Sequence, residues 1–253
     1  GFPIAGVVCN AVIVGGLANT SSGDFSFIGG GQDNSIRSFG KYSTIGGGLD
    51  NSITTSGSTI AGGRFNSNNS DNSTIGGGES NSIGSGKYNT IVGGLDNYIG
   101  QNSSNSTTAC YNVVGGRENC ITGPGTVCYN AIFGYNNKVY CNSSYNFTAG
   151  YLNIHGSLTS YSCASNYSTI FGFNNHICAN YGFIGGGYGN RILSGHANTA
   201  ILGTYNKSST AAKTTYMCNA CIFGGITKTT GTFKIDHPNP CKTSTHNLQH
   251  SFV

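Results

Sequence analysis

Charged residues are scarce in this sequence and tryptophan is absent. Charged residues make up 8% of the 253 residues, and the formal net charge is +4. The lysines and arginines occur singly rather than in the basic clusters that bind nucleic acid. No apolar run approaches the roughly 20 residues that a bilayer-spanning helix needs. We therefore expect neither nucleic-acid binding nor membrane insertion.

Glycine is abundant instead, with 41 residues, and asparagine, serine, threonine, tyrosine and isoleucine account for much of the remainder. This composition disfavours helix and favours strands and turns. Collagen is excluded because glycine does not fall at every third residue. Polar, glycine-rich chains are often disordered, but disorder gives no reason for isoleucine and asparagine to recur in register. The composition therefore predicts an all-β fold.

A Gly-x-x-Asn step recurs along almost the whole chain, at intervals of roughly 15 to 22 residues. The unit from Tyr42 to Ile53 reads Y-S-T-I-G-G-G-L-D-N-S-I, and self-similarity at such a period indicates a stacked architecture. A degenerate last copy begins at Gly225, with Lys228 in place of asparagine. The complete copies begin at Gly16, Gly31, Gly48, Gly63, Gly78, Gly94, Gly116, Gly134, Gly150, Gly172, Gly187 and Gly203. We expect a parallel β-solenoid of about thirteen short rungs.

Three kinds of side chain recur at fixed positions of the unit. Isoleucine occupies two of these positions, and Asn68 stands where one isoleucine is expected. We predict two stacked isoleucine ladders and one asparagine ladder with hydrogen bonds between rungs. We also expect the asparagines to tolerate a left-handed corner. The isoleucine positions are Ile28, Ile45, Ile60, Ile75 and Ile91 in one phase, and Ile36, Ile53, Ile83 and Ile99 in the other.

Two isoleucines per rung make a small core. At about 0.8 kcal/mol per buried CH₂, they would barely offset the ordering of so much glycine and asparagine. Three chains that each turn one isoleucine face to a shared axis would solve this problem, and the sequence therefore predicts a homotrimer. Residues 1–24 are expected to form an irregular first rung and 25–225 the repeat, with loop insertions after about residue 100. Residues 226–253 break the pattern and form a separate C-terminal segment.

Ten cysteines are present. Cys110 and Cys128 stand at equivalent places before Gly116 and Gly134, so stacked rungs would bring them roughly 4.8 Å apart, within disulfide range. We predict this bridge, with Cys120 and Cys141 as candidates for a second. Disulfides favour an extracellular or virion-exposed setting, and buried free thiols are the alternative.

Aromatic residues recur before the first strand of the unit. The candidate binding residues are Tyr42, Tyr88, Tyr111, Tyr129 and Tyr167, which together with Phe25 are expected to form a partly exposed ladder. An uncharged, tyrosine-rich surface suits stacking against sugar rings. Cell-surface glycans are therefore the expected class of external partner, beside another virion or filament protein.

The polar groups show no catalytic or metal-binding constellation. Asp33, Asp50, Asp96 and Glu118 precede the repeat asparagine, where one carboxylate per rung is typical of a solvated edge rather than of a glycosidase pair. The calcium-binding glycine-rich pattern is not matched. The histidines lack zinc-site spacing, and Cys218-x-x-Cys221 has no second pair. We expect no catalytic site, no metal and no cofactor.

The unit S-T-I-G-G-G-x-x-N-S-I resembles the head repeats of trimeric autotransporter adhesins, over roughly residues 10–225. That resemblance implies left-handed parallel β-rolls, three chains to a head. This sequence departs from those heads in using asparagine for serine and isoleucine for alanine, and in its longer insertions and many cysteines.

The tail carries a second resemblance. The residues F-K-I-D-H-P at 233–238 and H-S-F-V at 250–253 are similar to a segment that opens a C-terminal domain in phage and giant-virus fibre-like proteins. That resemblance implies an assembly domain with self-cleavage. Asp236, His237, His250 and Ser251 offer a nucleophile and bases for such a step, and the alternative is that they position the tail.

Together these features predict a structural fibre or head protein for attachment or surface display, most consistent with a virus or phage. The alternatives are a secreted adhesin and a filament or capsid component without a ligand. An enzyme acting on polysaccharide would need a groove with two carboxylates. An ice-binding solenoid would need a regular exposed threonine face, and the threonine of Ser-Thr-Ile is interrupted after Ile91.

Overall fold

The computed structural model describes residues 10–100, 107–123, 125–140, 142–157 and 163–217. These ranges form an all-β parallel solenoid of about 12 turns, as the repeat predicted. They hold no helix long and apolar enough to cross a membrane. The chain divides into two compact units, and the first, Gly1–Cys218, contains every described residue. The degenerate copy at Gly225 lies outside the described residues.

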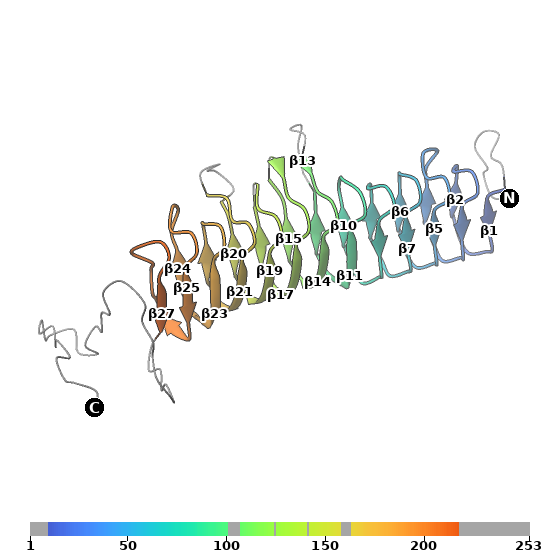
Figure 1. Cartoon of the computed structure of the whole chain (residues 1–253). Helices are drawn as coiled ribbons and strands as arrows, with labels where there is room; N and C mark the ends of the chain where they lie inside the picture. Colours follow the sequence, from blue (N-terminus) through green and yellow to red (C-terminus); the bar gives the residue numbers. More distant parts are fainter. Residues whose placement is uncertain (1–9, 101–106, 124, 141, 158–162, 218–253) are drawn as a thin grey trace, which may run out of the picture. The chain divides into compact units, whose positions relative to one another are not determined.

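One strand of each turn belongs to a 14-stranded parallel sheet, called sheet A, whose strands lie side by side along the stack (Figure 1). In order these strands are β1 (Val12–Ile13), β3 (Phe27–Ile28), β5 (Thr44–Ile45), β7 (Thr59–Ile60), β9 (Thr74–Ile75), β11 (Thr90–Leu95), β14 (Val113–Arg117), β17 (Ala131–Tyr135), β19 (Phe147–Tyr151), β21 (Thr169–Phe173), β23 (Phe183–Tyr188), β25 (Ala200–Leu202) and β27 (Thr215–Met217), with β26 (Thr204–Tyr205) beside β23.

The second strand of each turn belongs to an 11-stranded parallel sheet, called sheet B. Its strands are β2 (Thr20–Ser21), β4 (Ser35–Ile36), β6 (Ser52–Ile53), β8 (Ser67–Asn68), β10 (Ser82–Ile83), β12 (Tyr98–Ile99), β15 (Cys120–Ile121), β18 (Lys138–Val139), β20 (Ile154–His155), β22 (His176–Ile177) and β24 (Arg191–Ile192). In addition, β13 (Thr107–Thr108) pairs with β16 (Gly125–Thr126).

The register of both sheets places identical positions of the repeat on top of one another. Ile45 is the Cα partner of Ile60 in sheet A, and Ile36 is the partner of Ile53 in sheet B. Because side chains alternate across a strand, the residue before each isoleucine points outward while the isoleucine points into the space between the sheets. Both predicted isoleucine ladders are therefore confirmed.

The isoleucine core is closed within a single chain. Ile28, Ile45, Ile53 and Ile99 each have 0% of their surface exposed, and the other ladder isoleucines are buried to the same degree. The two ladders face one another across the interior of each turn and form one continuous cluster through much of the stack. No isoleucine face is left over for a shared axis. The prediction that three chains share an axis of isoleucine faces is therefore wrong, and a trimer would have to form through another surface.

One turn interrupts this core with polar side chains. Thr148 in β19 and His155 in β20 occupy the two isoleucine positions of the same turn, and both are fully buried. They separate the cluster that ends with Ile132 and Val139 from a second cluster that begins with Ile170. Burial lowers the pKa of His155 to about 3, so its imidazole is neutral at physiological pH.

The predicted asparagine ladder is confirmed and is completely buried. Asn66 donates from Nδ2 to Oδ1 of Asn51 on the previous turn, over 3.0 Å, and to the carbonyl oxygen of Gly78 on the next turn, also over 3.0 Å. Its own Oδ1 accepts from the backbone N–H and the Nδ2 group of Asn81. Each asparagine thus bonds to the turns on both sides, so the ladder satisfies polar groups that water cannot reach.

The left-handed corner lies one residue before the ladder asparagine, not at it as expected. Asp50 and Phe65, which precede Asn51 and Asn66, have φ of 53° and 58°. The glycine of the Gly-x-x-Asn step is required because neighbouring turns approach closely there: a Cβ on Gly48 would overlap the carbonyl oxygen of Gly63. Each turn therefore needs a glycine where the backbones approach and an asparagine where the hydrogen bonds form. The corner residue just before the asparagine varies in type.

Candidate functional site

Six tyrosines stack in register along one corner of the solenoid. Their ring centroids are 5.0, 5.0, 4.8, 4.7 and 5.3 Å apart, and neighbouring rings are within 14° of parallel. We call this row the tyrosine ladder; its members are Tyr88, Tyr111, Tyr129, Tyr145, Tyr167 and Tyr181. Four of the five predicted residues belong to it. The fifth, Tyr42, pairs separately with Phe25, at 5.2 Å, and the sequence prediction missed Tyr145 and Tyr181.

The backbone presents these rings from a left-handed conformation. Tyr129 and Tyr145 both have φ of 60°, a region that costs a non-glycine residue roughly 1–2 kcal/mol. In return, each backbone N–H donates to a carbonyl oxygen of the previous turn, as Tyr129 does to Cys110 over 3.0 Å. Stacking of the rings contributes about 0.5–1.5 kcal/mol per pair and offsets the backbone cost. The ladder thus stiffens the corner.

The same stacking limits what the ladder can bind. Each inner ring is covered on both faces by its neighbours, so only ring edges and hydroxyl groups face the solvent, and Tyr111 and Tyr129 are each 48% exposed. Sugar rings therefore have access to ring faces only at the two ends of the row. The pKa of Tyr129 is raised, first by desolvation and then by the neighbouring Tyr145 and Tyr111, so its hydroxyl is a neutral hydrogen-bond donor.

A second asparagine ladder, which the sequence prediction missed, supports the tyrosine ladder from inside. Asn112 donates from Nδ2 to Oδ1 of Asn89 over 3.1 Å, and Asn130 donates in turn to Asn112 over 3.1 Å. Asn89, Asn112 and Asn130 are buried and directly follow ladder tyrosines. The repeated dipeptide Tyr-Asn was the available signal.

The outer face of sheet A carries no charged residue at the positions that flank its buried residues, in the described part of the chain; Arg117, at the end of β14, lies beside this face over the ring of Tyr135. This face comprises the residue before and the residue after each buried position, and it changes from small to aromatic along the stack. In the first half it is mostly threonine, glycine and alanine, whereas the second half carries Phe133, Phe147, Phe171, Phe183 and Met217, each 37–51% exposed. The outward positions of sheet B, by contrast, include Lys138, His176 and Arg191.

The phenylalanines of this face alternate with small residues. Phe133 is the Cα partner of Ala149, and Ala131 is the partner of Phe147 on the same pair of strands. Phe171 likewise lies opposite Gly185. Beside them runs another aromatic row that the sequence prediction missed, with centroids 4.8 to 5.1 Å apart; its members are Tyr135, Tyr151, Phe173, Tyr188 and Tyr205. The phenylalanine rings of neighbouring strands lean toward one another, with centroids 6.3 and 5.5 Å apart, and the result is an exposed apolar surface with rings repeating once per turn.

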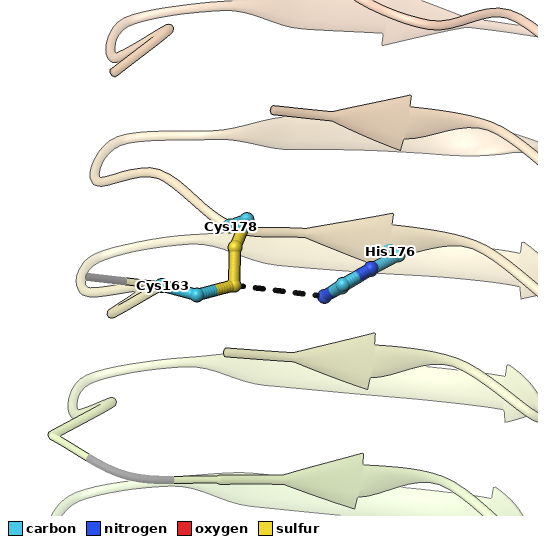
Figure 2. Close-up of side chains that lie close together, drawn as sticks. All are labelled: Cys163, His176 and Cys178. Atoms are coloured by element: carbon cyan, nitrogen blue, oxygen red, sulfur yellow. Dashed lines mark hydrogen bonds between the residues drawn. A yellow bond between two sulfur atoms is a disulfide. The ribbon is translucent and has the colours of Figure 1, made fainter. Parts of the chain in front are cut away.

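Cys163, His176 and Cys178 lie together beside β22 of sheet B (Figure 2). Their ligand-type atoms all lie within 4.8 Å of one another, and the two cysteines are bridged as a disulfide with Cα atoms 4.7 Å apart. Nε2 of His176 lies 3.9 Å from Sγ of Cys163 and 2.8 Å from the carbonyl oxygen of Gly156. The pKa of His176 is lowered, chiefly by burial, so the ring is neutral at physiological pH. The sequence prediction missed this cluster.

The predicted Cys110–Cys128 pair is brought together but is present as two thiols. The backbone N–H of Cys110 donates to Sγ of Cys128 over 3.0 Å on the next turn, and burial raises the pKa of the Cys128 thiol to about 11. Their oxidation to a disulfide stays a prediction. Cys120 is also a thiol, with its pKa raised to about 11 by burial, whereas Cys141 lies outside the described residues.

The predicted solvated carboxylates lie on the left-handed corner beside the asparagine ladder. Asp33, Asp50 and Asp96 are exposed, and Glu118 is paired with Arg117 over 2.9 Å. None of them lines the shallow groove that runs over the ladder glycines between β5 and β11. The one carboxylate in that groove belongs to Glu79, which pairs with Arg64 over 2.6 Å.

The family resemblances of the repeat and the tail gain no support from comparison with known proteins. The sequence matches no family model and no curated protein. The fold bears out the coarser part of the first resemblance, a parallel β-solenoid of about 12 turns. The tail residues Asp236, His237, His250 and Ser251, together with the Cys218–Cys221 motif, lie outside the described residues.

Proposed function

We propose that this chain is a rigid structural module of a fibre or head that assembles side by side with further copies of itself. The main supporting observation is the outer face of sheet A. The positions on either side of its buried residues carry no charge along the described length, and they are aromatic over the second half. Large exposed apolar surfaces on soluble proteins mark sites of association. The display of such a fibre on a virus, a phage or a cell surface is part of the proposal, and the two sequence resemblances support it.

Rigidity follows from the way the turns are joined. Each turn bonds to the next through two parallel sheets, a buried asparagine ladder and stacked aromatic rings. None of these interactions between turns depends on a ligand or on a loop, so we expect the stack to be rigid along its length. A stiff stack of this kind suits a spacer or a display element better than a site that must open and close.

Further copies of this chain are the occupant that fits the outer face best. Phe133 and Phe147 lie opposite Ala149 and Ala131 on neighbouring strands, so one ring per turn stands on this face. A second copy carries the same row of phenylalanine rings at the same spacing, so two rows can pack against one another, and neither row contains a charged residue. We propose a homotrimer, in agreement with the architecture that the adhesin-head resemblance implies.

Light scattering coupled to gel filtration tests this proposal. The wild-type chain should have the mass of three copies at micromolar concentration. The double variant Phe147→Asp with Phe171→Asp should have the mass of one copy, because two carboxylates would be buried without partners at the contact. Phe39→Asp is the matched control, since Phe39 is 78% exposed but lies outside sheet A, and its mass should not change. A monomeric wild type, or an unchanged double variant, would refute the proposal.

Attachment to an extended polysaccharide is a second candidate, favoured by the row of tyrosine hydroxyls. The tyrosine ladder offers donors at one-turn spacing along a straight edge, and several weak contacts in a row add up through multivalency. On an array of neutral and acidic polysaccharides, Tyr129→Phe with Tyr145→Phe should bind roughly tenfold more weakly than wild type, since stacking is kept and two hydrogen bonds are lost. Tyr205→Phe, in the other aromatic row, is the control. Equal binding by all three proteins, or none, would dismiss the candidate.

A further inference from the structure

The cluster of Cys163, His176 and Cys178 contains three side chains that can ligate a metal ion, and the disulfide involves only two of them. Two cysteine sulfurs, joined in a disulfide, and one imidazole nitrogen converge from two segments (Figure 2). One segment is the insertion before β21, and the other is β22 with the residue after it. His176 and Cys178 are two residues apart on an extended segment, so both point outward while Ile177 between them is buried. Cys163 closes over them and is only 5% exposed.

The histidine nitrogen lies near the distance from sulfur that a tetrahedral metal requires. With Zn–S near 2.3 Å and Zn–N near 2.0–2.1 Å, tetrahedral geometry places sulfur and nitrogen about 3.6 Å apart and two sulfurs about 3.8 Å apart. Nε2 of His176 lies 3.9 Å from Sγ of Cys163, and all three donor atoms lie within 4.8 Å. The nitrogen–sulfur separation is therefore within a few tenths of an ångström of the tetrahedral value, whereas the two bonded sulfurs must separate to about 3.8 Å once they are reduced. Rotation of the two side chains can achieve this, because the Cα atoms are 4.7 Å apart.

We propose that the dithiol form of this cluster binds one thiophilic divalent cation, Zn²⁺ being the best match, through Cys163, Cys178 and His176. The two thiols lose their protons to solvent on binding, so the site becomes Zn²⁺ with two thiolates, neutral overall, plus one neutral imidazole. Water takes the fourth position. The proposal does not depend on how copies of the chain assemble.

Neighbouring groups are compatible with this site. His176 uses Nε2 to contact the carbonyl oxygen of Gly156 over 2.8 Å, so metal binding at Nε2 replaces this bond and moves the ring proton to Nδ1. Arg191, the Cα partner of His176 on the next turn, disfavours a proton on the ring. A neutral metal centre places no net positive charge beside the guanidinium. His155 belongs to the interior row with Ile177 and is not a ligand.

Disulfide and metal are alternative states of the same two sulfurs. A Cα separation of 4.7 Å lies within the usual range of a disulfide, roughly 4.4–6.8 Å, and a bridged pair cannot supply two thiolates. Reduction by a phosphine consumes one water, yields two thiols and a phosphine oxide, and opens the site to the cation. Metal binding should therefore require prior reduction.

The test uses the full chain, reduced with excess phosphine under anaerobic conditions and titrated with Co²⁺ as the spectroscopic probe. We expect thiolate-to-cobalt charge-transfer absorption together with tetrahedral visible bands, displaced by one equivalent of Zn²⁺. Cys163→Ser and His176→Gln should each weaken cobalt binding at this site at least about 100-fold. Cys110→Ser with Cys128→Ser is the matched control and should leave the bands unchanged.

Other cysteines in the chain could bind cobalt, and the variants distinguish binding there from binding at Cys163, His176 and Cys178. Absence of the bands from the reduced wild type would overturn the proposal, as would identical bands in wild type and Cys163→Ser. Should Cys163→Ser lose its β-sheet circular dichroism, His176→Gln decides the matter alone, because it leaves both sulfurs in place. Unchanged tetrahedral bands in a folded His176→Gln would also overturn the site as described.

Discussion

Asn51 donates from Nδ2 to Oδ1 of Asn34, one turn earlier in the solenoid, over 3.0 Å, and the same group reaches the carbonyl oxygen of Gly63 one turn later over 2.9 Å. A single amide thus joins three successive turns. Because the contact is buried, it cannot be exchanged for water during local opening. Cooperativity along the stack should therefore depend on this ladder as much as on the isoleucines.

Asn66→Ala should be strongly destabilising. The change removes one bond from Oδ1 of Asn51 and one from the carbonyl oxygen of Gly78, each of which keeps a backbone N–H donor. It leaves the buried backbone N–H of Asn81 without a partner, which costs about 1–3 kcal/mol, and each other lost bond adds about 1 kcal/mol. We expect a loss of at least about 3 kcal/mol in the free energy of unfolding, measured by denaturant titration. Gln32→Ala, on the exposed corner, should stay within about 0.5 kcal/mol of wild type. Equal stability of the two variants would contradict a structural role for the ladder.

Two adjacent glycines should respond differently to alanine. Gly63 has φ of +91°, and a Cβ there would overlap the carbonyl oxygen of Gly78. Gly62 has no left-handed φ, and its nearest neighbour to a new Cβ is the carbonyl oxygen of Gly47 at 3.9 Å. Gly63→Ala should therefore lower the melting temperature by many degrees, whereas Gly62→Ala should have little effect. Thermal unfolding followed by circular dichroism compares the pair, and similar curves would mean that the close approach of turns is not required.

The polar turn at Thr148 and His155 should make stability depend on pH. The pKa of His155 falls from about 6.5 unfolded to about 3 folded, so the unfolded state takes up a proton first as the pH falls. Stability is therefore complete above about pH 6.5 and is lost progressively down to about pH 3. The loss should reach about 2 kcal/mol at pH 5.

His155→Val tests this origin directly. Val139 and Ile177 flank the position on neighbouring turns, so valine continues an existing row and removes the titrating group. The variant should lose much less stability between pH 7 and pH 5 than wild type, as measured by urea unfolding at each pH. His176, whose pKa is also lowered, contributes in the same direction and should leave a residual slope. An unchanged pH profile in His155→Val would assign the dependence to other groups.

Cys110 and Cys128 should form a disulfide slowly under mild oxidation. They hold equivalent places on adjacent turns. Burial raises the pKa of Cys128 to about 11, so only a small fraction of this side chain is thiolate, the reactive form, at neutral pH. Peptide mapping without reductant should find the bridge after incubation with oxidised glutathione, and it should form faster as the pH is raised. Pairing of Cys110 with any other cysteine would contradict the stacking of these two turns.

The sequence predicted the parts of this molecule that repeat. The Gly-x-x-Asn step was enough to predict parallel stacking, both isoleucine ladders and the buried asparagine ladder, because each depends on one residue type at one position. It could not show that a single chain encloses its core, since that depends on how far apart the two sheets lie. The left-handed corner was placed at the asparagine because the preceding residue varies among Asp50, Phe65 and other types.

The candidate metal cluster could not have been found from regular spacing. Cys163 and His176 are 13 residues apart across a full turn, and the interval depends on the length of an insertion. The alternating His176-Ile177-Cys178 was the one local signal, since it places two ligand types on the same side of a strand. The tyrosine row was predicted as a ladder, but its ring stacking, which restricts access to the faces, depends on the left-handed backbone.

The central claim is that each chain closes its own core and that copies associate only through the outer face of sheet A. Unfolding of the Phe147→Asp, Phe171→Asp variant, followed by circular dichroism over a hundredfold range of protein concentration, tests this claim most directly. The account predicts a monomer with the β-sheet spectrum of wild type and a midpoint that does not change with concentration. A monomeric variant that is unfolded, or one whose midpoint rises with concentration, would show that the core is completed between chains.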